Sequence, residues 1–395
     1  MSLKPATQCV NFPTADQHDA VVPPIYQTAT FRQPGALEFG EYDYSRSGNP
    51  TRNLLEQQLA QLEGGAHACA FASGMAAITA LARTLNSGDE IVAGDDLYGG
   101  TVRLLEKVLS RQAITVRYVD TTDLNAVKGA LSPRTKLMLI ETPSNPLLRI
   151  SDIRGLSQIA SDAGVLLAVD NSMLSPILQQ PLSLGADFVI HSATKFLCGH
   201  SDVTAGAIVT NDRALHEQIA FQQNAEGAAL APFESWLLLR GLKTLALRVE
   251  RQNDNAARIA QFLTNQETIK TVYYPGLEHQ PGYRLQRSQA RGDGAVITCT
   301  TGNAELSRLI VEGTKLFTIA VSFGSVGSTI SLPCRMSHAS IPAALRQKLA
   351  PPEDLIRLSV GIEDSSDLIE DLQQALIGAV VRADRESQLA AAVTA

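Results

Sequence analysis

Short apolar runs alternate with stretches of helical periodicity between residue 52 and about residue 210. The runs are EIVA, ITVRYV, KLMLIE, VLLAVD, DFVIHS and GAIVT, and they are rich in β-branched and aliphatic residues. Runs that are apolar along most of their length are typical of strands covered by helices on both faces. The alternation therefore predicts an α/β domain built around a largely parallel sheet.

Two of these runs end in side chains that could carry chemistry. Asp170 closes GVLLAVD, and His191 with Ser192 closes ADFVIHS. The carboxyl ends of parallel strands share one edge of the sheet, and open α/β sheets bind their ligands at that edge. We expect a functional site there.

Composition and periodicity divide the chain into three parts. Residues 1–50 are rich in proline and aromatic residues and poorly periodic, so we expect an N-terminal arm that packs on a partner subunit. Residues 51–245 hold the alternating pattern and form the large domain. A long helical pattern near Arg240 leads into a second unit of strands and helices, which predicts a smaller C-terminal α+β domain over residues 246–395.

Composition narrows the class of protein and of partner. With 395 residues, 45% apolar and 18% charged, the chain is long and apolar enough to form a folded protein with two or three domains, and disorder is excluded. A net charge of -7 leaves no excess of positive charge that would attract nucleic acid or an anionic membrane. We therefore expect small molecules or other subunits as partners, with no nucleic acid and no membrane.

Cysteine usage and the N-terminal sequence bear on the compartment. The five cysteines are odd in number, scattered and never spaced as CxxC, which favours a reducing compartment. The N-terminus lacks an apolar signal region, and no apolar run approaches the length of a membrane span. We expect a cytoplasmic location.

Lys195, in the segment HSATKF, is the first candidate for chemistry. A lysine held directly after a buried strand loses hydration, which lowers its pKa and makes its amine suitable for a Schiff base. Taken alone, an ordinary surface lysine is the better interpretation. Asp170 reverses that preference, because a buried carboxylate can keep a pyridinium nitrogen protonated, as pyridoxal phosphate requires. Alone, Asp170 could equally cap a turn.

Other side chains near these two could bind the rest of such a cofactor. Gly74 and Met75 precede the helical pattern AAITALARTL, so their amides would lie at the positive end of a helix, where phosphate binds. Ser192 and Thr194 add hydroxyl donors. Tyr98, in DDLYGG, could stack on a flat ring, although a rim or core tyrosine is equally compatible with the pattern.

One cluster resembles a metal site but is incomplete. Cys198, His200 and Asp202 stand at alternate positions, and no fourth ligand is evident. We expect a structural loop behind Lys195 and no metal site.

Seven segments occur in a fixed order along the chain. They are YDYSRSGNPTRNLLE, FASGMAA, DDLYGGT, ETPSNP, VDN, HSATKFLCGHSD and LIRLSVGIED. In this order and at these separations they resemble the cystathionine-metabolism (Cys/Met metabolism) family of pyridoxal-phosphate (PLP) enzymes, over about residues 20 to 380. Each segment alone is a weak signal, whereas their co-occurrence is specific.

The resemblance implies an architecture and an assembly. The family has the PLP-dependent transferase fold type I, which is like that of aspartate aminotransferase, with a mostly parallel seven-stranded sheet in the large domain. Its members are usually homotetramers built from dimers with shared active sites.

The resemblance also implies which residues bind the cofactor, pyridoxal 5'-phosphate. Lys195 would form the Schiff base and Tyr98 would stack on the ring, both as catalytic residues, and Asp170 would pair with the pyridinium nitrogen. The other implied cofactor-binding residues are Gly74, Met75, Ser192 and Thr194 at the phosphate, Asn145 near the ring hydroxyl, and Tyr44 with Arg46, which would reach the phosphate from the neighbouring subunit.

For the substrate, the resemblance implies that Arg357 and Ser322 hold its carboxylate, since the guanidinium is a planar fork suited to bidentate binding. Val321 would line the same pocket, at a position where many γ-synthases and γ-lyases of the family carry an acidic residue. The stretches AVSFGSVGSTISLPCRMSHASIP and AEGAALAPFESW are most similar to plant-type cystathionine β-lyases.

The expected function is therefore the cleavage of cystathionine to homocysteine, pyruvate and ammonia, in methionine biosynthesis. Two alternatives stay open: a cystathionine γ-lyase or γ-synthase, and a non-catalytic scaffold of the same fold. Retention of Lys195, Asp170 and Arg357 argues against the scaffold.

Overall fold

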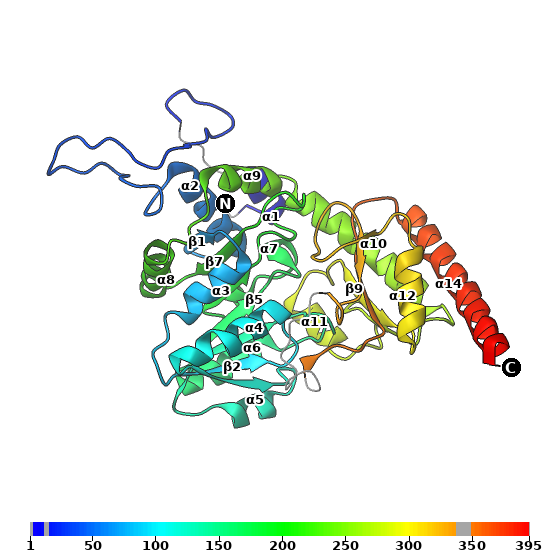
Figure 1. Cartoon of the computed structure of the whole chain (residues 1–395). Coiled ribbons are helices and arrows are strands. Elements are labelled where there is room, and N and C mark those ends of the chain that lie inside the picture. Colours follow the sequence, from blue (N-terminus) through cyan, green and yellow to red (C-terminus); the bar gives the residue numbers. More distant parts are fainter. Residues whose placement is uncertain (1–2, 12–15, 337–348, 395) are drawn as a thin grey trace.

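Two β-sheets lie side by side, connected by one long helix (Figure 1). The computed structural model describes residues 3–11, 16–336 and 349–394. The larger sheet has seven strands in the order β1-β7-β6-β5-β4-β2-β3. Its strands are β1 (His67–Phe71), β2 (Glu90–Gly94), β3 (Thr115–Val119), β4 (Thr135–Glu141), β5 (Leu166–Asp170), β6 (Phe188–His191) and β7 (Gly206–Thr210).

The pairing confirms the largely parallel sheet. Five strands that are neighbours in the sheet, β6, β5, β4, β2 and β3, run parallel to one another. The strand β7 pairs antiparallel with β6, and β1 pairs antiparallel with β7. The six apolar runs form β2 to β7. The sequence pattern did not predict β1, because its segment HACAF consists mainly of small residues with little preference for strands.

Helices cover both faces of this sheet, and α10 leads out of it. They are α2 (Pro50–Glu63), α3 (Gly74–Ala82), α4 (Gly99–Lys107), α5 (Leu124–Ala130), α6 (Ile153–Ala163), α7 (Ser175–Leu178), α8 (Arg213–Ala225), α9 (Pro232–Leu242) and α10 (Leu245–Thr264). Alternate residues of β4 show the layering: Leu137 and Leu139 join one buried cluster with α3 and α4, whereas Met138 and Ile140 join another with α6. Burial on both faces explains why the inner strands form nearly continuous apolar runs in the sequence, whereas β3, at the edge of the sheet, is only partly buried.

The second sheet confirms the smaller α+β unit. Its five strands run in the order β10-β11-β12-β9-β8 and are mostly antiparallel, and α12 and α14 pack against each other beside them (Figure 1). The elements are β8 (Thr271–Tyr273), α11 (Tyr283–Gln289), β9 (Val296–Thr300), α12 (Ala304–Gly313), β10 (Thr318–Ile319), β11 (Thr329–Ser331), β12 (Leu355–Ser359) and α14 (Ser365–Thr394).

The segment before α2 divides into two parts. The short helix α1 (Pro5–Val10) packs on α2 and α10 of its own chain, where Cys9 is buried. The later part, coloured dark blue in Figure 1, extends away from the body, and its apolar side chains Val21, Leu37 and Phe39 are exposed. It ends at Asn49, whose side chain caps α2. Within the described ranges, no helix is long and apolar enough to cross a membrane.

Candidate active site

A cavity of about 460 Å³ opens where the carboxyl edge of the large sheet faces loops of the second sheet. Eleven of the side chains singled out in the sequence line it: Gly74, Met75, Tyr98, Asn145, Asp170, Ser192, Thr194, Lys195, Val321, Ser322 and Arg357. They come from segments far apart in the chain, and the parallel strand order explains why so many of them meet at one edge.

Lys195 stands in the loop after β6, with its side chain in the cavity. Its Nζ donates a hydrogen bond to the Ser322 Oγ at 2.5 Å and lies 4.8 Å from the centre of the Phe323 ring. Burial, together with the positive charge of Arg357, lowers the pKa of Lys195 to about 8. A substantial fraction of this amine is therefore neutral near physiological pH, which is the form that acts as a nucleophile or base.

Two carboxyl groups lie together at the end of the central strands. Glu141 on β4 pairs in register with Asp170 on β5. Burial raises the pKa of Asp170, and burial with the nearby charge of Asp170 raises the pKa of Glu141 well above its ordinary value. The backbone N–H of Ser172 donates to Asp170 at 2.9 Å, and that of Tyr98 donates to Glu141 at 3.1 Å. Asp170 also accepts the Ser172 N–H and lies near the Lys195 amine, so it is the carboxyl better placed to stay ionised.

The N-terminus of α3 forms the anion-binding end of the cavity. The Ser73 hydroxyl accepts a hydrogen bond from the N–H of Ala76 at 3.1 Å, and helix geometry leaves the preceding N–H groups of Gly74 and Met75 without intrahelical partners. A Cβ on Gly74 would lie 2.9 Å from the Cβ of Ser192, so glycine allows the helix end to approach that serine closely.

Thr194 lines the same end, but its hydroxyl already has partners. It donates to the Ala205 carbonyl at 3.2 Å and accepts from the Ala205 N–H at 3.0 Å. It would have to exchange these hydrogen bonds to donate to an anion, so the Ser192 hydroxyl is the more available donor.

Arg357 on β12 faces the cavity from the second sheet and is buried. Its Nη1 donates to the Asn145 Oδ1 at 3.0 Å, and its Nη2 donates to the Ser322 carbonyl at 3.1 Å. Burial lowers the pKa of Arg357 to about 10, so it remains charged at neutral pH. Both of these partners are neutral, so the positive charge of the guanidinium is available to a carboxylate in the cavity.

The turn that carries Ser322 is strained and closely packed. Ser322 has a φ of 84°, in a region that non-glycine residues seldom adopt. Two residues later, Gly324 has a φ of 87°, and a Cβ there would come within 2.7 Å of the Phe196 nitrogen. This turn therefore rests directly against the backbone beside Lys195, with Val321 half-exposed at its start.

Tyr44 and Arg46 do not line this cavity. The Arg46 Nε donates to the Asn224 Oδ1 at 3.2 Å, and its guanidinium lies 5.2 Å from the centre of the Tyr44 ring. Their expected reach into a neighbouring subunit stays a prediction. Tyr98, in contrast, lies at the start of α4 with its ring exposed at the cavity.

Reasoning from the sequence missed Glu141 and Arg103, which also line the cavity. A signal for Glu141 was present, because it closes the run KLMLIE as Asp170 closes GVLLAVD. Arg103 lies one helical turn into α4, and only the position of that helix reveals its role as a second cation at the cavity.

The suspected metal cluster forms a local turn. Cys198 donates to Asp202 at 3.2 Å, and a ring nitrogen of His200 lies 2.7 Å from the Cys198 carbonyl oxygen. Among the residues that the structure describes, no group of three or more His, Cys, Asp or Glu side chains could hold a metal ion.

The donor set instead fits pyridoxal 5'-phosphate. The end of α3 with Ser192 suits the phosphate, Asp170 suits a protonated ring nitrogen, and the Lys195 amine suits the aldehyde carbon. These three functions lie around one cavity, as the cofactor requires.

The chain is similar to known proteins over almost its whole length. The family model described as Cys/Met metabolism PLP-dependent enzyme matches residues 6–377. The chloroplastic cystathionine beta-lyase of Arabidopsis thaliana is 54% identical over 357 residues, which are 90% of this chain and 77% of that protein. The cystathionine gamma-lyase of Bacillus subtilis is 51% identical over 357 residues, which are 90% of this chain and 94% of that protein.

Among solved structures, the cystathionine gamma synthase of Xanthomonas oryzae pv. oryzae in complex with cystathionine superimposes with a TM-score of 0.94. It is 41% identical in sequence, and the match covers 96% of this chain and all of that one.

Proposed function

Because this chain belongs to the Cys/Met metabolism family of PLP-dependent enzymes, we propose that it is a cystathionine β-lyase, which cleaves cystathionine to homocysteine, pyruvate and ammonia. The family match confirms the resemblance carried by the seven sequence segments, and with it pyridoxal 5'-phosphate as the cofactor. The structural match confirms the expected fold type. The observation that carries the proposal is a lysine amine and a buried arginine facing one cavity.

The positions of the residues around the cavity indicate which part of the cofactor each would hold. Lys195 would bind its aldehyde carbon, Asp170 its ring nitrogen, Tyr98 its ring face and Asn145 the region of its ring hydroxyl. The phosphate would be held by Gly74, Met75, Ser192 and Thr194, with Tyr44 and Arg46 contributed by a neighbouring subunit. When bound, pyridoxal 5'-phosphate supplies an electron sink for the negative charge that develops at the substrate Cα.

Arg357 orients the substrate for proton removal. Its guanidinium, fixed by Asn145 and by the Ser322 carbonyl, binds the α-carboxylate and so sets the direction of the Cα–H bond. Lys195 then takes the Cα proton on Nζ, since burial holds its pKa near the working pH of a general base. The hydrogen bond between Nζ and the Ser322 Oγ keeps the amine beside the carboxylate subsite.

In β-elimination the sulfur leaves from Cβ after this single proton transfer. The Lys195 ammonium can return a proton to the departing sulfur, so one side chain serves as both base and acid. Loss at Cγ requires a second proton to be removed from Cβ.

The cavity also offers a cation for each end of cystathionine. This substrate carries two carboxylates, and Arg357 and Arg103 line the same cavity. We assign Arg103 to the carboxylate of the homocysteine half. A substrate with a single carboxylate would not use it.

Val321 favours β- over γ-chemistry in this proposal. Its apolar side chain lines the cavity beside Ser322 and provides no carboxylate to anchor the distal ammonium of the substrate. The second candidate, a cystathionine γ-lyase or γ-synthase, is favoured by the relatives of those names with 51% and 41% identity.

We also propose a homotetramer of dimers with shared active sites, in the cytoplasm. Support for shared sites comes from the extended segment before α2, whose exposed apolar residues have no core of their own. Tyr44 and Arg46 belong to that segment.

The test is to incubate the purified holoenzyme with cystathionine and to measure the thiols released. The proposal expects homocysteine as the main thiol, and expects its release to be lost in Lys195→Ala. Release of cysteine in place of homocysteine would support the γ-lyase, and no release of either thiol by the intact holoenzyme would contradict both lyases.

A further inference from the structure

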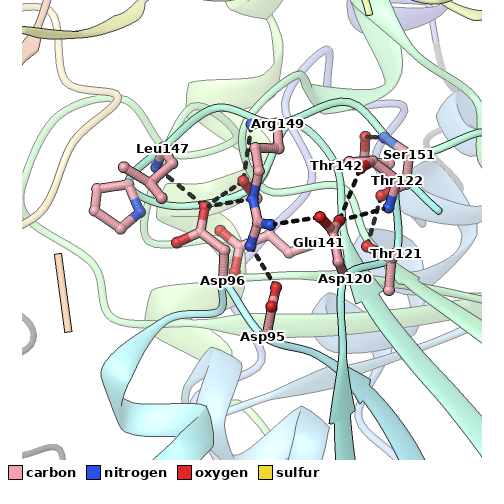
Figure 2. Close-up of polar contacts among 12 residues, drawn as sticks. Asp95, Asp96, Asp120, Thr121, Thr122, Glu141, Thr142, Leu147, Arg149 and Ser151 are labelled. Atoms are coloured by element: carbon pink, nitrogen blue, oxygen red, sulfur yellow. Dashed lines mark hydrogen bonds and ion pairs between the residues drawn. The ribbon is translucent and has the colours of Figure 1, made fainter. Parts of the chain in front are cut away.

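A cluster of charged side chains lies outside the cavity, where three strand ends meet (Figure 2). Arg149 points between three carboxylates: it hydrogen-bonds to Asp95, its Nη1 lies 3.2 Å from Asp120, and its Nε lies 3.8 Å from Asp96. Asp95 and Asp96 follow β2, and Asp120 follows β3. None of these four residues lines the cavity, and the mechanism above uses none of them.

Asp96 connects two loops that do contribute to the active site. Its Oδ2 accepts hydrogen bonds from the Ser144 hydroxyl and, at 3.1 Å, from the Leu147 N–H. Ser144 directly precedes Asn145, which holds the guanidinium of Arg357. Asp96 itself stands two residues before Tyr98. One carboxylate therefore fixes the loop after β2 to the loop after β4.

The loop after β4 is also closed on itself. Ser144 donates from its N–H to the Arg149 carbonyl at 3.0 Å, and Arg149 donates from its N–H to the Ser144 Oγ at 2.8 Å. The Pro146 carbonyl accepts from the Thr298 hydroxyl at 3.0 Å. Asn145 thus lies between two anchored neighbours, and the anchor on its N-terminal side depends on Asp96 and Arg149.

The charges of the cluster depend on Arg149. Burial raises the pKa of Asp96, whereas for Asp120 burial is outweighed by hydrogen bonds from Thr122 and by the charge of Arg149, which lower its pKa. Without the guanidinium, three neighbouring carboxyl groups would repel one another, and Asp96 would lose the charge that compensates its burial. The two loops would then move apart.

We propose that Arg149 and Asp96 are positioning residues for the carboxylate subsite, acting through Asn145 on the orientation of Arg357. The inference rests on the proposed function, because it assigns the contacts of Asp96 and Arg149, here called the loop clamp, to the carboxylate-binding step of that reaction. It predicts that breaking the clamp weakens binding of the α-carboxylate more than it slows the chemical step.

A matched control lies at the opposite end of β2. There Arg117 pairs with the buried Glu90 at 2.8 Å, and Glu90 accepts hydrogen bonds from the hydroxyls of Ser132 and Thr135, both at 2.9 Å. This pair has the same chemistry as Arg149 with Asp96, but it lies at the amino edge of the sheet, away from the cavity. If Arg149 and Asp96 only stabilised the fold, replacing Arg149 or Arg117 would affect glycine binding alike.

The experiment measures the dissociation constant of glycine for the holoenzyme, followed by the visible absorbance of the bound cofactor. Glycine carries the α-carboxylate but has no side chain to eliminate, so it isolates the Arg357 subsite. For Arg149→Met we expect the dissociation constant of glycine to rise by about tenfold or more. This is the effect of misdirecting one charge-assisted hydrogen bond between Arg357 and the carboxylate. For cystathionine we expect KM to rise in the same proportion, with kcat within about threefold.

Three comparisons make the outcome decisive. Arg117→Met should lower thermal stability while leaving the dissociation constant of glycine unchanged. Asp96→Asn, which keeps the size of the side chain, should raise the glycine constant, so the proposal is tested even if Arg149→Met does not fold. Arg149→Lys should restore part of the affinity.

An unchanged glycine constant in both Arg149→Met and Asp96→Asn would overturn the proposal, as would an equal rise in Arg117→Met. Failure of the proposed function is a separate result: the unmodified holoenzyme would then bind glycine without releasing homocysteine from cystathionine.

Discussion

Replacing Arg357 by lysine tests how much the guanidinium fork contributes. The substitution keeps a positive charge at the base of the cavity, but removes the planar group whose Nη1 and Nη2 bond to Asn145 and to the Ser322 carbonyl. The shorter-reaching ammonium cannot hold both partners and bind a carboxylate through two parallel hydrogen bonds. Since the site is buried, water cannot replace the lost contacts without cost.

The magnitude follows from these contacts. Losing one of two charge-assisted hydrogen bonds to the substrate costs about 1.5 to 3 kcal/mol. A loss of about 1.5 to 3 kcal/mol lowers kcat/KM by about 13-fold to about 160-fold. The carboxylate is bound before and during proton removal alike, so most of the loss should be in KM.

The assay compares two substrates in two variants. One substrate is cystathionine and the other is an S-alkylcysteine, which has a single carboxylate. Arg357→Lys should raise KM for both. Arg103→Lys, the control, should raise KM for cystathionine only.

Two results would refute this reasoning. One is a KM for both substrates in Arg357→Lys that stays within about threefold of the unmodified value while circular dichroism shows an intact fold. The other is a selective loss of cystathionine cleavage in Arg357→Lys, which would place the distal carboxylate at this arginine.

Three further predictions concern the amine, the assembly and the pocket. Cofactor-free protein should take up pyridoxal 5'-phosphate faster as the pH rises through about 8, because the lowered pKa of Lys195 makes its amine neutral there. The rate is measured from the return of the yellow colour, and a rate that still rises steeply at about pH 10 would contradict this. Inactive Arg46→Ala subunits mixed with inactive Lys195→Ala subunits should regain part of the activity if sites are shared, whereas hybrid dimers without activity, or a fully active monomer, would exclude sharing. Val321→Glu should lower the efficiency of β-elimination and raise the share of 2-oxobutyrate, since one pocket contact discriminates by about 1 to 3 kcal/mol; an unchanged ratio of keto acids would remove Val321 from the determinants of specificity.

The large sheet was predictable because most of its strands are buried on both faces and therefore stand out in the sequence as apolar runs. Six apolar runs predicted β2 to β7, and the position of Asp170 at a strand end predicted where the site lies. Glu141 follows from the same rule and was missed only because the rule was applied to two strands. The strand β1 was missed because Ala and Cys dominate it.

The Arg149 cluster could not be predicted in the same way. Its members lie in three loops, and no periodicity links residue 96 to residue 149. They meet because β2, β3 and β4 are adjacent and parallel, which is known only once the strand order is known. The predicted contact of Tyr44 and Arg46 with a neighbouring subunit would need a second chain, so it stays a prediction.

The central claim is that this chain cleaves cystathionine between Cβ and sulfur. The most direct measurement is chromatography of the keto acids formed from cystathionine by the unmodified holoenzyme, with Lys195→Ala as the blank. We expect pyruvate in excess over 2-oxobutyrate by about tenfold or more. An excess of 2-oxobutyrate would contradict it and assign the enzyme as a γ-lyase.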